Sequence, residues 1–171
     1  MNNFPQENFS ALDLPALSDT PFFEKQNPNA IGKKFIVFFL DDELFAVSAE
    51  QVAEVVHPPA ITPLPNTPDW LLGIANLRGE IISVADLSRF WKRQVFGRAL
   101  KPKLIVLRGQ NSNASIAFTV DKLSEIITLP DDEIEICEPN PFHISGKSSH
   151  QSNVLSLLDT EKLVASLELQ E

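Results

Sequence analysis

The sequence predicts a mainly β protein built from two small β-barrels, with short helices that include one at the C-terminus. Three observations lead to this prediction. A pattern of short apolar runs occurs twice along the chain, in the same order. Each copy holds about five strand-sized runs between proline or polar turns, which gives too little core for a stable unit alone. Closing such a sheet into a barrel removes its exposed edges.

Composition places the chain among ordinary globular proteins. It has 171 residues, of which 43% are hydrophobic and 22% charged. The net charge of −9 argues against a nucleic-acid or anionic-membrane partner, and no apolar run approaches the length of a membrane span. The first residues do not resemble a secretory signal, and the single cysteine, Cys137, indicates a reducing compartment. We therefore expect a cytoplasmic protein without direct membrane insertion.

Residues 1–32 are expected to form a flexible N-terminal tail ahead of a domain at 33–169. Four prolines interrupt this segment, which shows no helical or strand period. The segment is nevertheless rich in large apolar side chains, which are Phe4, Phe9, Leu12, Leu14, Leu17, Phe22 and Phe23. The sequence leaves open whether they form a docking peptide or pack against the domain.

The repeat begins at Lys34 and sets the expected order of strands. The matching segments of the two halves are 34–38 with 103–107, 45–47 with 118–120, and 52–56 with 123–127. A proline-punctuated segment follows in each half, at 58–68 and at 130–141. Finally, a glycine precedes an aspartate by thirteen residues twice, Gly73 before Asp86 and Gly146 before Asp159.

These matches predict how the domain is divided. We expect subdomain 1 at 33–97, subdomain 2 at 102–158 and a C-terminal helix at 159–169. Segments 34–47 and 103–120 should occupy corresponding positions in the two halves, with most strands antiparallel.

The stretch 72–87 carries the most distinctive pattern. Two apolar runs typical of short strands are joined by a polar turn at 76–80, in which Gly79 allows a positive φ. Arg78 is the one strong cation of the stretch, and a guanidinium on a turn suits bidentate contact with a carboxylate or with carbonyls. The second half has no arginine in the matching turn at 149–153. We therefore interpret Arg78 as serving function rather than the shared fold, with an ordinary surface arginine as the alternative.

Two short helices are expected, each following an aspartate. Asp86 suits the N-cap of a helix that carries Leu87, Phe90 and Trp91. The last helix has an apolar face made by Leu163, Val164 and Leu167.

The sequence Leu-Gly-Ile-Ala-Asn-Leu-Arg-Gly-Glu-Ile-Ile-Ser-Val-Ala-Asp-Leu at 72–87 closely resembles the signature of CheW-like domains. Segments 45–47, 52–55, 120–121 and 157–163 also match that family in order, so the resemblance covers 34–167. It implies two five-stranded, SH3-like β-barrels. Two features depart from the family pattern: Ser83 stands where proline is usual, and 143–151 is more polar than usual.

The resemblance implies a non-catalytic adaptor that couples a methyl-accepting chemoreceptor to a CheA-type histidine kinase, in chemotaxis, phototaxis or pilus-driven motility. Other CheW-like domains are further candidate partners. The functional arginine of the family falls on Arg78, and its groove positions fall near Val52 and Glu54. The expected receptor- or kinase-binding residues are Arg78, Asn76, Leu77, Gly79, Glu80, Val52 and Glu54.

The residues themselves leave a second class of function open, a β-barrel module that binds some other peptide or small ligand without any kinase. An enzyme is not indicated. His57, His143 and His150 show no metal-ligand spacing with Cys137 or with one another, and the chain has no phosphate-binding glycine loop. The acidic run at 131–135 is typical of a solvated face. We therefore expect no catalytic residues, no metal and no cofactor.

Overall fold

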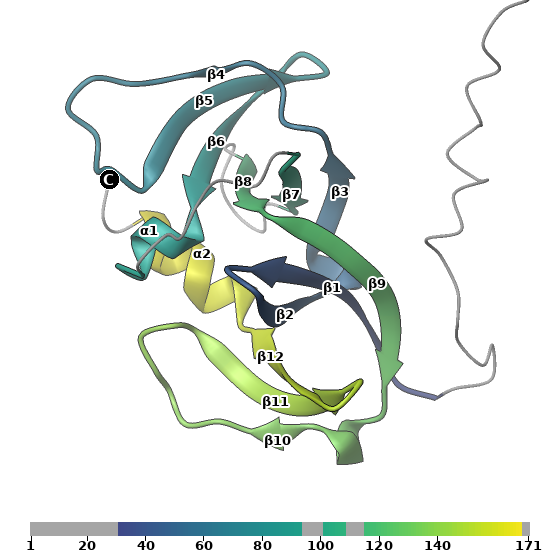
Figure 1. Cartoon of the computed structure of the whole chain (residues 1–171). Helices are drawn as coiled ribbons and strands as arrows, with labels where there is room; N and C mark the ends of the chain where they lie inside the picture. The colour runs from purple at the N-terminus through teal and green to yellow at the C-terminus, as the bar shows by residue number, and fades with distance from the viewer. Residues whose placement is uncertain (1–30, 94–100, 109–114, 169–171) are drawn as a thin grey trace, which may run out of the picture.

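The fold is mainly β in the computed structural model, which describes residues 31–93, 101–108 and 115–168 (Figure 1). The first half contributes strands β1 (Lys33–Leu40), β2 (Glu43–Ser48), β3 (Val52–Val56), β4 (Ile61–Thr62), β5 (Leu71–Leu77) and β6 (Glu80–Asp86). The second half contributes β7 (Lys103–Leu107), β8 (Ser115–Val120), β9 (Lys122–Leu129), β10 (Glu135–Ile136), β11 (Ile144–His150) and β12 (Asn153–Leu158). The helices are α1 (Leu87–Phe90) and α2 (Thr160–Glu168). The predicted tail, except Ile31 and Gly32, lies outside the described residues.

The strands form two sheets with equivalent strand orders. Sheet A runs β10-β11-β12-β2-β1-β9, and sheet B runs β4-β5-β6-β8-β7-β3. Replacing each strand by its counterpart in the repeat converts one order into the other. The pairs β1–β2 and β7–β8 therefore hold corresponding positions, as predicted, and within the described sheets only β2–β12 and β6–β8 are parallel. The predicted mainly β class is confirmed, and the strands form two sheets.

The two sheets do not coincide with the contiguous subdomains predicted at 33–97 and 102–158. Strand β1 pairs with β9, and β2 lies parallel to β12, so both join the strands of the second half. Strands β7 and β8 likewise join the first-half strands β3 and β6. A repeat identifies equivalent segments, but equivalent strand pairs can fit either sheet, and tertiary contacts decide between them. The two halves of the chain are therefore interlocked.

Each sheet also has one strand more than the five expected. The extra strands, β4 and β10, are two residues long and lie at sheet edges. They come from the proline-punctuated segments 58–68 and 130–141, which the pattern predicted only as connections. Proline cannot donate a ladder hydrogen bond, which keeps these edges short.

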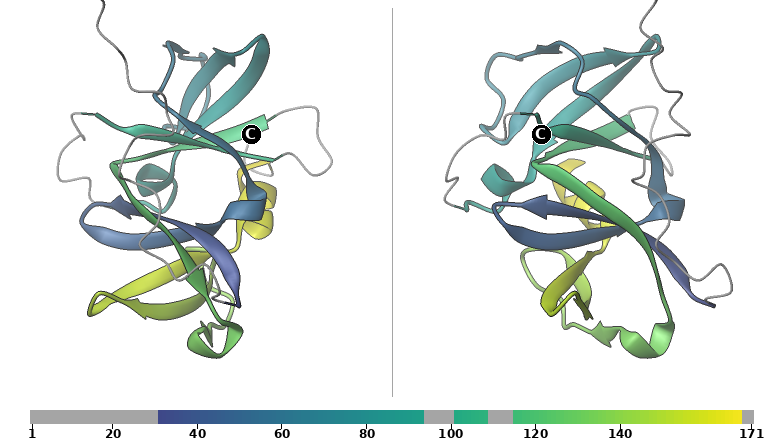
Figure 2. Two further views of the ribbon diagram at one scale, coloured as in Figure 1. Left: turned by 90° about the vertical axis from the view of Figure 1, so that its right-hand side faces the viewer. Right: turned by 45° about the vertical axis from the view of Figure 1, so that its right-hand side comes forward.

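Buried side chains join the two sheets into one unit. The largest apolar cluster takes residues from both sheets and both helices, including Phe38, Phe118, Leu87 and Leu163, all fully buried. Each sheet has a smaller cluster of its own. Full burial of one such side chain stabilises by about 1.5–3 kcal/mol. In both views of Figure 2 the β5–β6 and β11–β12 hairpins lie at opposite ends of the molecule.

The two aspartates of the repeat act as helix caps, as predicted for Asp86. The Asp86 carboxylate accepts a hydrogen bond from the Arg89 N–H at 3.1 Å, and Asp159 accepts one from the Lys162 N–H at 3.1 Å. Helix α1 is shorter than expected, because it ends at Phe90, and Trp91 follows it. Helix α2 is longer and buries Leu163 and Leu167 in the shared core.

Candidate functional site

The strongest candidate site lies at the tip of the β5–β6 hairpin. The strands pair as far as Leu77 and Glu80, so the turn consists of Arg78 and Gly79 and is shorter than the predicted 76–80. Arg78 has a φ of 53° and Gly79 a φ of 92°, as two-residue hairpin turns require. The Asn76 Oδ1 accepts a hydrogen bond from the Gly79 N–H at 3.0 Å. The hairpin therefore presents Arg78 at its tip.

Arg78 forms an ion pair with Glu54 on β3. The distance from Arg78 Nη2 to Glu54 Oε2 is 2.9 Å. Strands β3 and β5 are far apart in the order of sheet B, so this contact shows that the sheet curls back on itself. Asp86, another conceivable partner, instead pairs with Arg89 at 3.3 Å.

Exposure decides what the Arg78–Glu54 pair can do. The Arg78 side chain is 78% exposed and that of Glu54 is 27% exposed. A solvent-exposed ion pair contributes only about 0–1 kcal/mol to folding. The pair is therefore a poor candidate for a structural tie, and most of the Arg78 side chain faces solvent.

The other predicted site residues are divided between surface and core. Asn76, Gly79 and Glu80 are exposed around Arg78, and Leu77 is half-buried. Val52 is different, because it is only 5% exposed and belongs to the core that both sheets share. A β-bulge between Val52 and Glu54 separates the two on strand β3. The structure thus brings six of the seven predicted residues to one surface and places the Val52 side chain inside.

The pattern missed one apolar residue beside this turn. Ile81 pairs with Asn76 across the hairpin, and it is 55% exposed. The run from Ile81 to Ala85 is almost wholly apolar, so no alternation distinguished its outward-facing member from the buried Ile82. An exposed isoleucine next to an exposed guanidinium gives the site both an apolar and a charged contact.

The second half builds the same contact with different side chains. The β11–β12 turn has positive φ at Gln151 (48°) and Ser152 (66°). Glu125, the counterpart of Glu54, contacts His150 Nε2 at 2.9 Å and Gln151 Nε2 at 2.8 Å. Contact between a carboxylate and the turn therefore belongs to the shared fold. The arginine at this turn belongs to the first half alone.

The surroundings of His143 shift its pKa. Its Nε2 lies 2.8 Å from the Ser166 hydroxyl of α2, and its ring stacks on Phe90 at 5.9 Å between centroids. Its Nδ1 is buried and finds no hydrogen-bond partner among the described residues. Burial lowers the pKa of His143; the Asp159 carboxylate opposes this effect, and the charge of Lys162 adds to it.

We expect this histidine to make stability depend on pH. Its folded-state pKa is lowered, so the unfolded chain binds the proton more readily and stability should fall as pH drops below about 6.5. The free energy of unfolding, measured with urea at pH 7.5 and pH 5.5, should fall less between these pH values in His143→Gln than in the wild type. The comparison cancels other titrating groups, which both proteins share. Equal losses in the two proteins would contradict this role.

Asp159 responds to acid at a lower pH. Burial alone would raise the pKa of its carboxyl, but hydrogen bonds and charge from Lys162, with a smaller effect of His143, hold that pKa below its usual range. The stabilisation from this cap is therefore present above about pH 4 and is lost as pH falls through the lowered pKa.

Two further properties concern the nature of the site. Within residues 31–93, 101–108 and 115–168, no three His, Cys, Asp or Glu side chains are grouped so that they could hold a metal ion. No helix in this part of the chain has the length and apolar character needed to cross a membrane.

The fold and the site define a domain of two interlocked β-sheets with an exposed, charged hairpin tip. Residues 34–168 match the model of the CheW-like domain family, and the chain belongs to that family.

Individual relatives agree with this assignment. The chain is 26% identical over 147 residues to a chemotaxis protein CheW of Klebsiella aerogenes, covering 81% of this chain and 86% of the relative. It is 40% identical over 58 residues to the protein FrzA of Myxococcus xanthus, covering 34% and 36%. The crystal structure of the scaffolding protein TtCheW from Thermoanaerobacter tengcongensis matches with a TM-score of 0.69 and 28% identity, over 75% of this chain and 90% of that one.

Proposed function

We propose that this protein is a non-catalytic cytoplasmic adaptor that couples a methyl-accepting chemoreceptor to a CheA-type histidine kinase. Chemotaxis, phototaxis and pilus-driven motility are the behaviours such a signalling complex would control. Membership of the CheW-like family supports the proposal, as do relatives named chemotaxis proteins and a solved relative described as a scaffolding protein.

The proposed binding site rests on one observation: Arg78 is exposed on a two-residue turn. The Arg78 guanidinium can bind a carboxylate or backbone carbonyls of a partner. Glu54 can accept a hydrogen bond from a donor group of the same partner. Asn76, Leu77, Gly79 and Glu80 complete the proposed surface, and Val52 supports it from the core. Among these, the charged pair gives a partner a defined orientation.

Binding of the purified full chain to its kinase and receptor tests the proposal. The kinase and the receptor of the source organism should each bind the chain in isothermal titration calorimetry. Adding the chain should increase the amount of kinase that sediments with receptor-containing membranes. A chain that binds neither protein would overturn the adaptor role and leave the peptide- or ligand-binding module as the alternative.

A further inference from the structure

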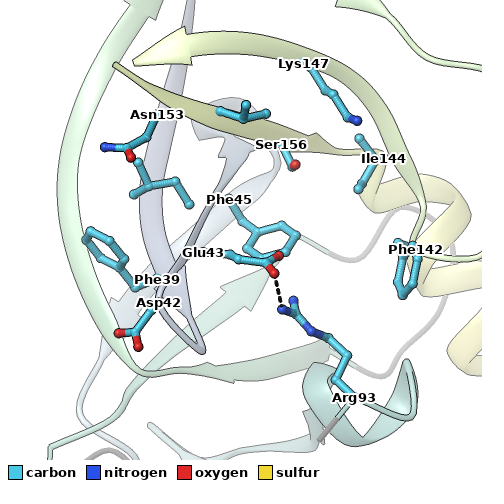
Figure 3. Close-up of a pocket in the computed structure, with 12 residues that line it drawn as sticks. Phe39, Asp42, Glu43, Phe45, Arg93, Phe142, Ile144, Lys147, Asn153 and Ser156 are labelled. Carbon is cyan, nitrogen blue, oxygen red and sulfur yellow. Dashed lines mark ion pairs between the residues drawn. The ribbon is translucent and has the colours of Figure 1, made fainter. Parts of the chain in front are cut away.

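A cavity of about 610 Å³ opens at one face of sheet A, and no residue of the β5–β6 hairpin that carries Arg78 lines it (Figure 3). The β1–β2 turn, the residues after α1, the loop before β11 and the β11–β12 hairpin all contribute to its wall. Figure 3 shows Phe45 at its base with Phe142, Arg93 and Lys147 around it. Its volume lies within the range of about 300–1,000 Å³ that is usual for ligand pockets.

The apolar side chains of this cavity are only partly covered. Phe142 is 40% exposed and Val154 is 62% exposed, whereas Phe45 beneath them is buried. Large exposed apolar side chains gathered around one hollow are typical of an interaction surface. The aromatic contacts continue inward from Phe142 to Trp91, at 5.9 Å, so the wall is held by the core.

The charges of the wall are balanced. Arg93 pairs with Glu43, at 2.8 Å between Nη2 and Oε1, and lies over the Phe45 ring at 5.6 Å. The other charged residues that line the cavity are Lys147 and Asp42, one of each sign. A wall without net charge does not select a strongly charged partner. It favours an occupant that is held by apolar side chains.

We propose that the N-terminal segment of this same chain, residues 1–30, docks in this cavity through its phenylalanines. That segment contains four phenylalanines and three leucines, and its charged residues are Glu7, Asp13, Asp19, Glu24 and Lys25. The pair Phe22–Phe23 supplies two adjacent aromatic rings, which suit a cavity lined by Phe45, Phe142 and Val154.

The length of chain before β1 permits this contact. Lys33 lies ten positions after Phe23, and at roughly 3.3 Å per position this stretch of chain reaches about 33 Å. The cavity is lined by Phe39, six residues along β1 from Lys33, or about 20 Å at the same rise. Phe4 and Phe9 have a longer tether still.

The tether also explains why this segment, rather than a free peptide, is the occupant. A short flexible connection gives an effective concentration in the millimolar range. A contact with an intrinsic Kd of about 1 mM would then be occupied in roughly half of the molecules. Docking in this cavity leaves the Arg78 hairpin uncovered, because no residue of that hairpin lines the cavity.

Paramagnetic relaxation in the full chain tests the proposal. Cys137 is the single cysteine of the chain, and its N–H bonds to the Ser145 carbonyl, next to Ile144 in the cavity wall. A nitroxide on Cys137 should remove most of the intensity of the amide signals around Phe22, because relaxation by a nearby nitroxide dominates even when only about half of the molecules are docked. Without the label, the double variant Phe22→Ser/Phe23→Ser should shift the methyl signals of Val154 and Ile144.

One variant in the cavity and one elsewhere on the surface distinguish docking in the cavity from nonspecific hydrophobic binding of the tail. Val154→Asp should restore the tail signals in the labelled protein. Ile81→Asp is the matched control, because Ile81 holds the corresponding place in the first half, is 55% exposed and does not line this cavity. It should leave the signal loss unchanged.

Three results would overturn the proposal. The first is a tail whose signals are insensitive to the nitroxide, together with unshifted Val154 methyl signals in the double variant. The second is an equal effect of Val154→Asp and Ile81→Asp. The third is signal loss in isotope-labelled chains mixed with separate nitroxide-carrying chains, which would place the tail on a second copy.

Discussion

Arg78→Ala is expected to weaken binding of the kinase or the receptor about tenfold or more, while the protein stays folded. Removal of a partly desolvated arginine contact at an interface typically costs about 2 kcal/mol, and 1.4 kcal/mol corresponds to a tenfold change in Kd. The fold loses little, because the Arg78 side chain is 78% exposed and its pair with Glu54 is a surface ion pair. The free energy of unfolding should therefore change by less than about 1 kcal/mol.

Arg78→Lys should restore only part of the lost affinity. An ammonium keeps the charge but cannot offer two parallel N–H groups to a carboxylate. A full recovery with lysine would mean that charge alone suffices. No recovery would mean that the planar fork carries the contact.

Gln151→Ala is the matched control for these variants. Gln151 contacts Glu125 at the corresponding turn of the second half, at 2.8 Å, so its removal breaks one of the two contacts of Glu125 with this turn, leaves that of His150, and removes no charge. Denaturant unfolding and calorimetric binding should be measured for all three variants. An unfolding midpoint that drops sharply in Arg78→Ala, while the remaining folded protein binds normally, would reverse the assignment and make Arg78 structural.

The sequence pattern located the strands and the turn well, because both depend on local chemistry. Apolar runs separated by proline or glycine turns identify strands, whichever strand each one pairs with. Gly79 identifies a turn with positive φ. Asp86 was likewise predictable as a cap, because a short carboxylate before an apolar helical turn satisfies a backbone N–H.

The exchange of strands between the halves was not predictable from that chemistry. Strands β1 and β7 have nearly the same pattern, so propensity alone assigns neither of them to a particular sheet. The decision lies in packing, where Phe35 pairs with Ile127 and Val55 pairs with Ile105. Contacts between residues so distant in sequence leave no local signal.

The candidate site was predictable in its charged part and not in its apolar part. A lone arginine in an apolar stretch stands out, and the structure places it on the surface beside Glu54. Val52 and Ile81 were assigned less well because both are aliphatic strand residues. Their exposures differ in the structure, 5% for Val52 and 55% for Ile81, but residue type alone does not distinguish them.

Gly73→Ala is expected to be the most destabilising of these substitutions, by roughly 3 kcal/mol or more, from φ strain of about 1–3 kcal/mol plus a steric clash. Gly73 has a φ of 135°, which side-chain-bearing residues rarely adopt. A Cβ at this position would lie 2.1 Å from the Thr62 carbonyl oxygen and 2.9 Å from the Pro63 Cα. Both are backbone atoms, one in β4 and one in the residue that follows it, so relief requires the edge strand to move away from β5.

Gly146→Ala offers a control from the other half of the repeat. A Cβ there would meet the Ile134 Cγ2 at 2.8 Å and the Glu135 carbonyl oxygen at 3.1 Å. Gly146 has no positive φ, and the closest atom is a side-chain methyl rather than backbone, so the expected loss is smaller, about 1–2 kcal/mol. Urea unfolding of the wild type and both variants gives the comparison, with equal m-values as the condition for reading midpoints as stability. Equal destabilisation by the two substitutions would contradict the argument, because of the two glycines only Gly73 combines a positive φ with a severe clash against the backbone of the neighbouring edge strand.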